Sequence, residues 1–156
     1  ADMARGIYRL VHDLRPSQLD DLGLVPALRF LCEQKSRKFN LNLDFQTSGA
    51  ARRLDPLVET ALFRVGQEAL KNLALHSQAQ DGRVEIVYAE NDVTLRVSDR
   101  GRGFDPAQSF RPPHGWGLAG MKERVESVGG TLSIDSAHGQ GTIIEVRVPL
   151  SLKEVS

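Results

Sequence analysis

Two periods of apolar residues follow each other along the chain and predict strands and helices within one folded unit. Apolar and polar residues alternate, as a half-buried strand requires. This pattern predicts strands at residues 41–45, 84–88, 93–97, 132–134 and 144–150, with a hairpin joining the second to the third. Apolar residues three and four positions apart predict helices at residues 4–14, 24–38, 56–76 and 118–128. Residues 17–23 are interpreted as a turn and residues 47–56 as a loop.

Length and composition indicate a single domain. The chain has 156 residues, enough for one core, and 20 basic residues balance 20 acidic ones. This balance gives no overall field that favours nucleic acid or an anionic membrane. Cys32 is the only cysteine, which excludes an internal disulfide and fits a reducing, cytoplasmic compartment. No apolar run is long enough to span a bilayer and no signal peptide is found, but the chain starts as if in mid-helix, so a membrane anchor could lie upstream.

Asp99 is the first candidate for a binding residue. The alternation of the strand at 93–97 continues to Asp99 and places its carboxylate on the apolar face. A buried charge costs several kcal/mol without a partner, so we expect a hydrogen-bond donor from protein, water or a ligand. Gly101 and Gly103 follow and permit close approach of a second group. Alternatively, this Asp-x-Gly-x-Gly segment is an ordinary turn after a strand.

The helix predicted at 56–76 carries polar residues where its apolar stripe should continue. Asn72 lies within the stripe, Glu68 lies one turn earlier on its edge, and His76 extends the row by another turn. An amide oxygen and a carboxylate suit Mg²⁺, which completes its octahedron with water and phosphate oxygens. In the alternative interpretation these residues form a polar helix edge satisfied by neighbouring backbone, and His76 is simply a helix-end residue.

A proline-rich stretch at 104–114 without any period predicts an exposed loop, and a lid is its functional interpretation. Gly115, Gly117 and Gly120 then open a helix that carries Leu118 and Met121. Glycines at a helix start expose backbone N–H groups, which together with the helix dipole form a site for phosphate. Glycine also serves in plain turns, so this motif alone is weak.

Taken together, the motifs resemble the ATP-binding domain of sensor histidine kinases. The segment FRVGQEALKNLALHSQA resembles the N box, SDRGRGFDP the first glycine box, and HGWGLAGMKERVESVGGTLSIDSAHGQGTIIEVRVPL the second glycine box with the terminal strands. DLRPSQLDDLGLVPAL resembles the junction before the catalytic domain in the nitrate-sensor-like subgroup. The resemblance implies an α+β two-layer sandwich of the GHKL (Bergerat) type, with a mixed β-sheet and helices on one face. It also implies a boundary between the end of a dimerisation helix with its junction (1–22) and the catalytic domain (23–156).

The resemblance implies a role for each candidate residue. Asp99 would accept from the adenine amine, and Asn72 would hold Mg²⁺ with Glu68 nearby as the catalytic pair. The remaining nucleotide-binding positions would be His76, Gly101, Gly103, Gly115, Gly117, Leu118, Gly120, Met121, Gly141 and Thr142, the last lining the adenine end.

The function implied is phosphoryl transfer from ATP·Mg²⁺ to a histidine on a dimerisation domain of the same protein, for relay to a response regulator. The full-length protein would be a homodimer with no nucleic-acid partner. His12, in the sequence VHDLRP, is not assigned as the phosphoacceptor, whose H box would lie upstream. We therefore expect this chain to bind nucleotide without phosphorylating itself. The alternatives are an ATP-hydrolysing domain of the gyrase and chaperone type and a degenerate nucleotide-binding interaction module.

Overall fold

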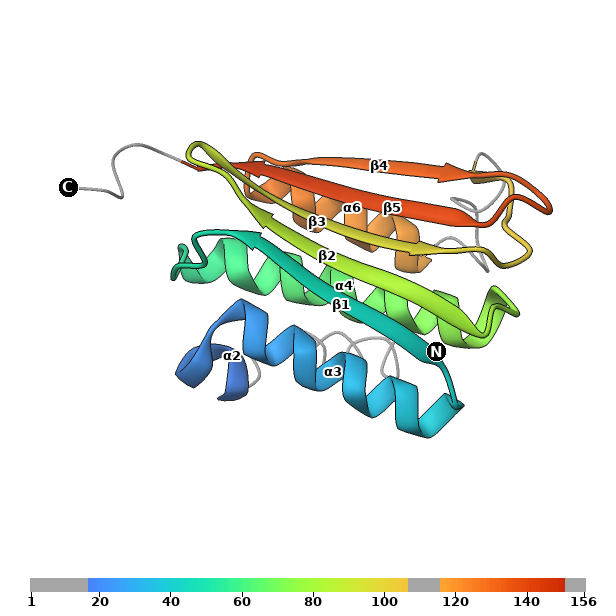
Figure 1. Ribbon diagram of the computed structural model, residues 1–156. Helices are drawn as coiled ribbons and strands as arrows, with labels where there is room; N and C mark the ends of the chain where they lie inside the picture. The colour runs from blue at the N-terminus through green and yellow to red at the C-terminus, as the bar shows by residue number, and fades with distance from the viewer. Residues whose placement is uncertain (1–16, 107–115, 151–156) are drawn as a thin grey trace, which may run out of the picture.

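The computed structural model describes residues 17–106 and 116–150, which form a sheet with helices packed on one face. The sheet has five strands in the order β1-β2-β3-β5-β4. In Figure 1, α4 and α6 lie behind the sheet and α3 runs along β1. The predicted two-layer sandwich with a mixed sheet is confirmed. Among the described residues, no helix is both long and apolar enough to cross a bilayer.

The strands are β1 (Asn42–Gly49), β2 (Asp81–Tyr88), β3 (Asp92–Asp99), β4 (Thr131–Ser136) and β5 (Thr142–Pro149). β1 pairs with β2 in parallel, whereas the remaining pairs are antiparallel, including the predicted β2–β3 hairpin. The three central strands bury the alternate apolar residues that the period of two predicts, namely Val84, Ile86, Tyr88, Val93, Leu95, Val97, Ile144, Val146 and Val148. These side chains form the sheet's half of the core.

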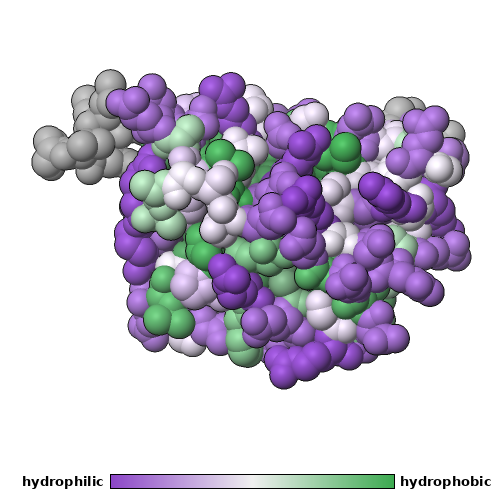
Figure 2. Space-filling view, viewed as in Figure 1, coloured by the Kyte–Doolittle hydropathy of each residue, from purple (hydrophilic) through white to green (hydrophobic). Residues whose placement is uncertain are grey.

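The outward face of the sheet is polar, so no second layer of helices is needed there. Figure 2 shows mostly hydrophilic side chains on this side, with small apolar patches between them. Arg96 pairs with Glu145 across β3 and β5, with 3.6 Å between Nε and Oε2. Arg147 forms an ion pair with Asp92, with 2.6 Å between Nη2 and Oδ2. Such exposed ion pairs help to fix the register between paired strands and add little to stability.

The helices are α2 (Ser17–Leu22), α3 (Leu24–Phe39), α4 (Pro56–His76) and α6 (Trp116–Ser127). The predicted bounds of α4 are confirmed, and its start has a clear cause. Asp55 caps the helix by accepting a hydrogen bond of 2.8 Å from Leu57 N, and Pro56 stands at its first turn, where its missing N–H is not needed. The predicted stripe of α4 is buried and consists of Val58, Ala61, Leu62, Val65, Ala69 and Leu73.

Two sequence interpretations were wrong. Residues 17–23 were interpreted as a turn, but residues 17–22 form the short helix α2, because Leu19 is fully buried and its carbonyl accepts from Gly23 N at 3.1 Å. Residues 47–49 were assigned to a loop, but they extend β1, because they continue the parallel pairing with β2. Gly49 permits this with a φ of +80°, at a place where a Cβ would overlap with the carbonyl oxygen of Tyr88.

Three predictions fall on residues outside the described part of the chain. These are the helix at 4–14 with His12, nearly all of the loop at 104–114, and Gly115.

Candidate functional site

Asp99 ends β3 with its side chain on the face of the sheet that packs on the helices. It continues the buried series Val93, Leu95 and Val97, and its own side chain is half-buried. In the sheet it lies between Gly82 of β2 and Thr142 of β5. The sequence prediction of an inward carboxylate is therefore confirmed in its orientation.

The Asp99 carboxylate is only lightly compensated. Its Oδ1 accepts a hydrogen bond of 2.7 Å from Gly101 N, and no ion pair to it is found within residues 17–106 and 116–150. Burial raises the pKa of the Asp99 carboxyl, the Gly101 N–H lowers it, and the nearby Asp81 carboxylate raises it. The acid thus retains acceptor capacity for an additional donor.

The loop after Asp99 is attached to the last turn of α4. The carbonyl of Ser77 accepts from Arg102 N at 2.7 Å, and the carbonyl of His76 accepts from Arg102 Nε at 2.6 Å. A Cβ on Gly101 would overlap with that Ser77 oxygen, so glycine is required for this approach. The first glycine segment therefore lies directly against the end of the long helix, as a shared binding site requires. The His76 side chain itself is exposed.

Gly103 and Gly141 bring the β4–β5 turn against the same loop. Gly103 has a φ of +65° and Gly141 a φ of +76°. A Cβ on Gly103 would overlap with the Ala137 carbonyl, and one on Gly141 with the Asp99 carbonyl. Three backbone segments are therefore in close contact around the end of β3, and Thr142, 7% exposed, lies beside them.

Glu68 on α4 meets the start of α6. A Cβ on Gly117 would overlap with Glu68 Oε1, so the second glycine segment packs directly on this carboxylate. Asn72 lies one turn further along α4, half-buried, between Glu68 and His76. The structure thus brings one end of α6, the C-terminal half of α4 and the end of β3 to one region of the molecule.

Of the three candidates on α6, two are buried in the core and one lies against open space. Leu118 and Met121 are part of the hydrophobic core, where they are 4% and 2% exposed. Gly120 has open space where a Cβ would stand. The nucleotide contacts assigned to these three residues stay predictions.

Two serines contribute to this region that the sequence analysis did not select. Ser77 is 7% exposed, and its Oγ donates to Leu73 O at 2.6 Å and accepts from Ala79 N at 3.0 Å. Ser136 Oγ accepts from Phe104 N at 2.9 Å, donates to Gly141 O at 3.0 Å and lies 2.9 Å from Thr142 Oγ1. Serine is common at the ends of helices and strands, so the sequence carries no signal that distinguishes these two.

The donor set fits Mg²⁺ in the form expected for a nucleotide complex. No group of three or more His, Cys, Asp or Glu residues that could hold a metal is present in the described part of the chain. Asn72 and Glu68 nevertheless supply an amide and a carboxylate one turn apart on α4. Mg²⁺ typically takes one or two protein ligands and completes its shell with phosphate oxygens and water. Asn72 is the residue that would hold it, together with the nucleotide.

A second acidic residue of α4, Glu59, lies in a quite different environment. It is fully buried, and Arg53 donates to both of its oxygens at 3.1 Å. Arg53 also donates to the carbonyls of Leu19 and Asp20. The ion pair joins the loop before α4 to α4 itself, and the two hydrogen bonds to carbonyls join that loop to α2. The pair was missed in the sequence, because the two residues belong to segments with no shared period.

Comparisons with known proteins find relatives of this chain by sequence. The sequence model of the family described as "Histidine kinase-, DNA gyrase B-, and HSP90-like ATPase" matches residues 57–152. The signal transduction histidine-protein kinase/phosphatase DegS of Bacillus subtilis (strain 168) is 42% identical over 142 residues, covering 88% of this chain and 37% of DegS. The oxygen sensor histidine kinase NreB of Staphylococcus carnosus (strain TM300) is 40% identical over 145 residues, covering 93% of this chain and 42% of NreB. The chain thus spans about two fifths of the length of these relatives.

Solved structures support the fold. The histidine kinase domain of the Erythrobacter litoralis EL346 blue-light activated histidine kinase superposes with a TM-score of 0.67 at 17% identity, covering 85% of this chain and 63% of that one. The mycobacterial sensor histidine kinase MprB superposes with a TM-score of 0.60 at 24% identity, covering 80% of this chain and 93% of that one.

Proposed function

The chain belongs to the histidine kinase-, DNA gyrase B- and HSP90-like ATPase family, and from this premise we propose that it is the catalytic domain of a sensor histidine kinase. In this proposal ATP·Mg²⁺ binds where the C-terminal half of α4, the end of β3 and the start of α6 meet. Its γ-phosphoryl group goes to a histidine on a dimerisation domain of the same protein, which forms a homodimer.

The observation that carries the proposal is the half-buried Asp99 carboxylate. It faces the helices, accepts from Gly101 N, and forms no ion pair with any of the described residues. An exocyclic amine of adenine is a donor of the right kind for such an acceptor. Because Thr142 pairs with Asp99 in the sheet and is buried beside it, Thr142 would define the adenine end of the site.

The other residues would position phosphates and metal. Bound Mg²⁺ neutralises charge on the phosphoryl oxygens, and phosphoryl transfer depends mainly on positioning and such neutralisation. Asn72 would orient the ion through its amide oxygen. The Glu68 carboxylate, held against Gly117, would accept a proton or orient water at the phosphate end. The N–H groups at the start of α6 would bind the phosphates.

The partners follow from the names of the relatives. DegS is named a signal transduction histidine-protein kinase/phosphatase and NreB an oxygen sensor histidine kinase, so the proposed acceptor of the relay is a response regulator. The domain boundary between residues 22 and 23 and a cytoplasmic location belong to the same proposal.

Calorimetric titration with ATP tests the proposal, with and without Mg²⁺ and with the Asp99→Asn variant as matched control. We expect binding by the native chain, tighter with Mg²⁺, and a strong loss in the variant. Absence of detectable binding at millimolar ATP would contradict the proposal. Measuring the phosphate that the chain alone releases from ATP distinguishes a kinase domain from an ATP-hydrolysing domain. A kinase domain without its acceptor histidine should release almost none.

A further inference from the structure

The edge of the sheet farthest from β4 carries backbone groups that no strand satisfies. β1 is the first strand in the sheet order and pairs only with β2 within the described residues. An unpaired strand edge is a template for an additional strand, and folded proteins usually cover or block it. This edge is independent of the proposed nucleotide site, which lies near β3, β5 and α6.

The direction of the free groups follows from two hydrogen bonds. Asn42 N donates to Gln80 O, so even-numbered residues of β1 direct their backbone groups toward β2. Leu41 N points the other way and donates to Ser36 O of α3 at 3.0 Å. The backbone N–H and C=O groups that point away from the sheet therefore belong to Leu43, Phe45 and Thr47. These residues follow Leu41 along β1, after the point at which α3 covers the edge.

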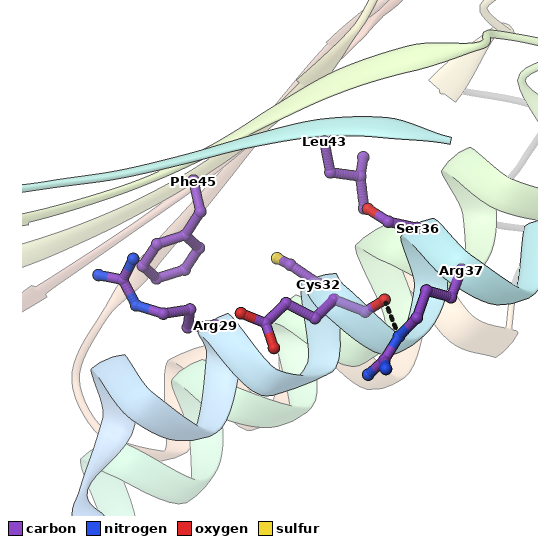
Figure 3. A pocket seen from close by; sticks show the side chains of 7 residues that line it. Arg29, Cys32, Ser36, Arg37, Leu43 and Phe45 are labelled. Carbon is purple, nitrogen blue, oxygen red and sulfur yellow. Dashed lines mark hydrogen bonds between the residues drawn. The ribbon is translucent and has the colours of Figure 1, made fainter. Parts of the chain in front are cut away.

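A hollow of about 530 Å³ lies beside this edge, between β1 and α3. It is lined by Arg29, Cys32, Glu33, Ser36, Arg37, Leu43 and Phe45. Figure 3 shows Phe45 and Leu43 pointing from β1 toward α3, with Cys32 between them and the arginines at either end. Burial raises the pKa of the Cys32 thiol to about 12, so the floor of the hollow is neutral. The floor of the hollow is thus apolar, whereas Glu33, four residues from each arginine on α3, adds one carboxylate to its lining.

The charges around the hollow have a definite spacing. Arg29 and Arg37 are exposed and eight residues apart on α3, which is about 12 Å along a helix. The guanidinium of Arg29 lies 4.8 Å from the centre of the Phe45 ring, and Arg37 Nε donates to the Glu33 carbonyl at 3.4 Å. In an extended peptide, side chains four residues apart point the same way and are about 13 Å apart. Two acidic side chains at that spacing would reach both arginines.

We propose that the edge of β1 and the hollow beside it bind an extended acidic peptide as an additional strand of the sheet. The peptide backbone pairs with Leu43, Phe45 and Thr47. Its side chains that face the hollow follow the order acidic, apolar, acidic, in which the apolar one contacts Phe45 and Leu43 and the acidic ones reach Arg29 and Arg37. This mode of recognition takes its affinity from main-chain hydrogen bonds and its specificity from alternate side chains.

The test uses the whole 156-residue chain and a synthetic peptide, acetyl-Glu-Thr-Val-Thr-Glu-amide, observed by amide NMR and hydrogen exchange. We expect the amides of Leu43, Phe45 and Thr47 to become protected from exchange when the peptide is added. A peptide methylated on the backbone nitrogens that face β1 should not protect them, whereas methylation on the opposite edge should have no effect. Equal protection by both methylated peptides would overturn the proposal, as would no binding at millimolar peptide.

Charge reversal tests the specificity. Arg29→Glu should weaken binding of the acidic peptide about tenfold and improve binding of the matching lysine peptide. Lys122→Glu makes the same change of charge on α6 and should leave both affinities unchanged. If the Arg29→Glu variant binds both peptides as the native chain does, the proposed occupant is wrong. If protection of the same amides rises with protein concentration in the absence of peptide, a second copy of the chain occupies the edge and the proposal is also wrong.

Discussion

Two acidic residues that face the interior, Glu59 and Asp99, show how the same chemical group serves stability at one place and binding at another. Glu59 is fully buried, and both of its oxygens accept from Arg53. Asp99 is half-buried and accepts from the Gly101 N–H, and burial raises its pKa. A buried carboxylate whose oxygens both accept from an arginine helps to hold the fold together. A buried carboxylate that keeps acceptor capacity lowers the stability of the fold but can bind a ligand.

Replacement of Asp99 should have the largest effect on binding. We expect Asp99→Asn to weaken ATP binding about a hundredfold, because an amide replaces a charged acceptor. The same variant should melt slightly higher at pH 7, since the ionised acid is disfavoured in the fold. Calorimetric titration and thermal unfolding measure the two effects. A variant with native affinity would refute the adenine contact.

Replacement of Arg53 should do the reverse. Arg53→Met leaves the Glu59 carboxylate in the interior without its cation, so we expect the melting temperature to fall by about 5 °C. ATP affinity measured well below the transition should not change. If affinity falls together with stability, the two acids do not have separate roles.

Gly117→Ala should have an intermediate effect, since its Cβ would overlap with Glu68 Oε1. The flexible Glu68 side chain can move, so stability should change little. Displacing Glu68 from the phosphate end should lower ATP affinity or phosphotransfer to a separate dimerisation domain about tenfold. Glu126→Ala is the control, because Glu126 is an exposed residue of α6 that has no assigned role at the site. Equal effects of the two substitutions would argue against a special role of Glu68.

Of the changes considered, a change of pH near 7 should have the smallest effect on ATP affinity. Asp99 accepts fully only when ionised, and its pKa lies above the ordinary 3.8. ATP affinity should therefore fall as the pH decreases through that raised pKa, earlier than for an exposed aspartate. Protonation also removes the free-energy cost of burying the charge. The contribution of Asp99 to the free energy of unfolding should therefore rise as the pH falls through the same range. Titrations at several pH values, with Asp99→Asn as the pH-independent control, measure this.

The sequence was sufficient for most of the fold because its central strands and α4 have unbroken apolar periods. It failed where tertiary contacts decide the local structure. At Ser17–Leu22 the burial of Leu19 turns a predicted turn into a helix, and at residues 47–49 the pairing with β2 turns a predicted loop into strand.

For the site, the inward orientation of Asp99 and the polar row on α4 followed from periodicity. The hydrogen bonds from Phe104 N to the Ser136 hydroxyl and from Arg102 N to the Ser77 carbonyl could not be predicted, because each joins segments far apart in the chain. Neither could the Arg53–Glu59 pair, since a buried charge is recognised only when its partner is known.

The parallel pairing of β1 with β2 also affects how the domain reaches its native state. Antiparallel neighbours such as β2 and β3 are joined by a short turn, whereas β1 reaches β2 only through the whole length of α4. Closing that long connection is slow compared with a hairpin. We therefore expect β1 to pair with β2 later than β3 does during refolding.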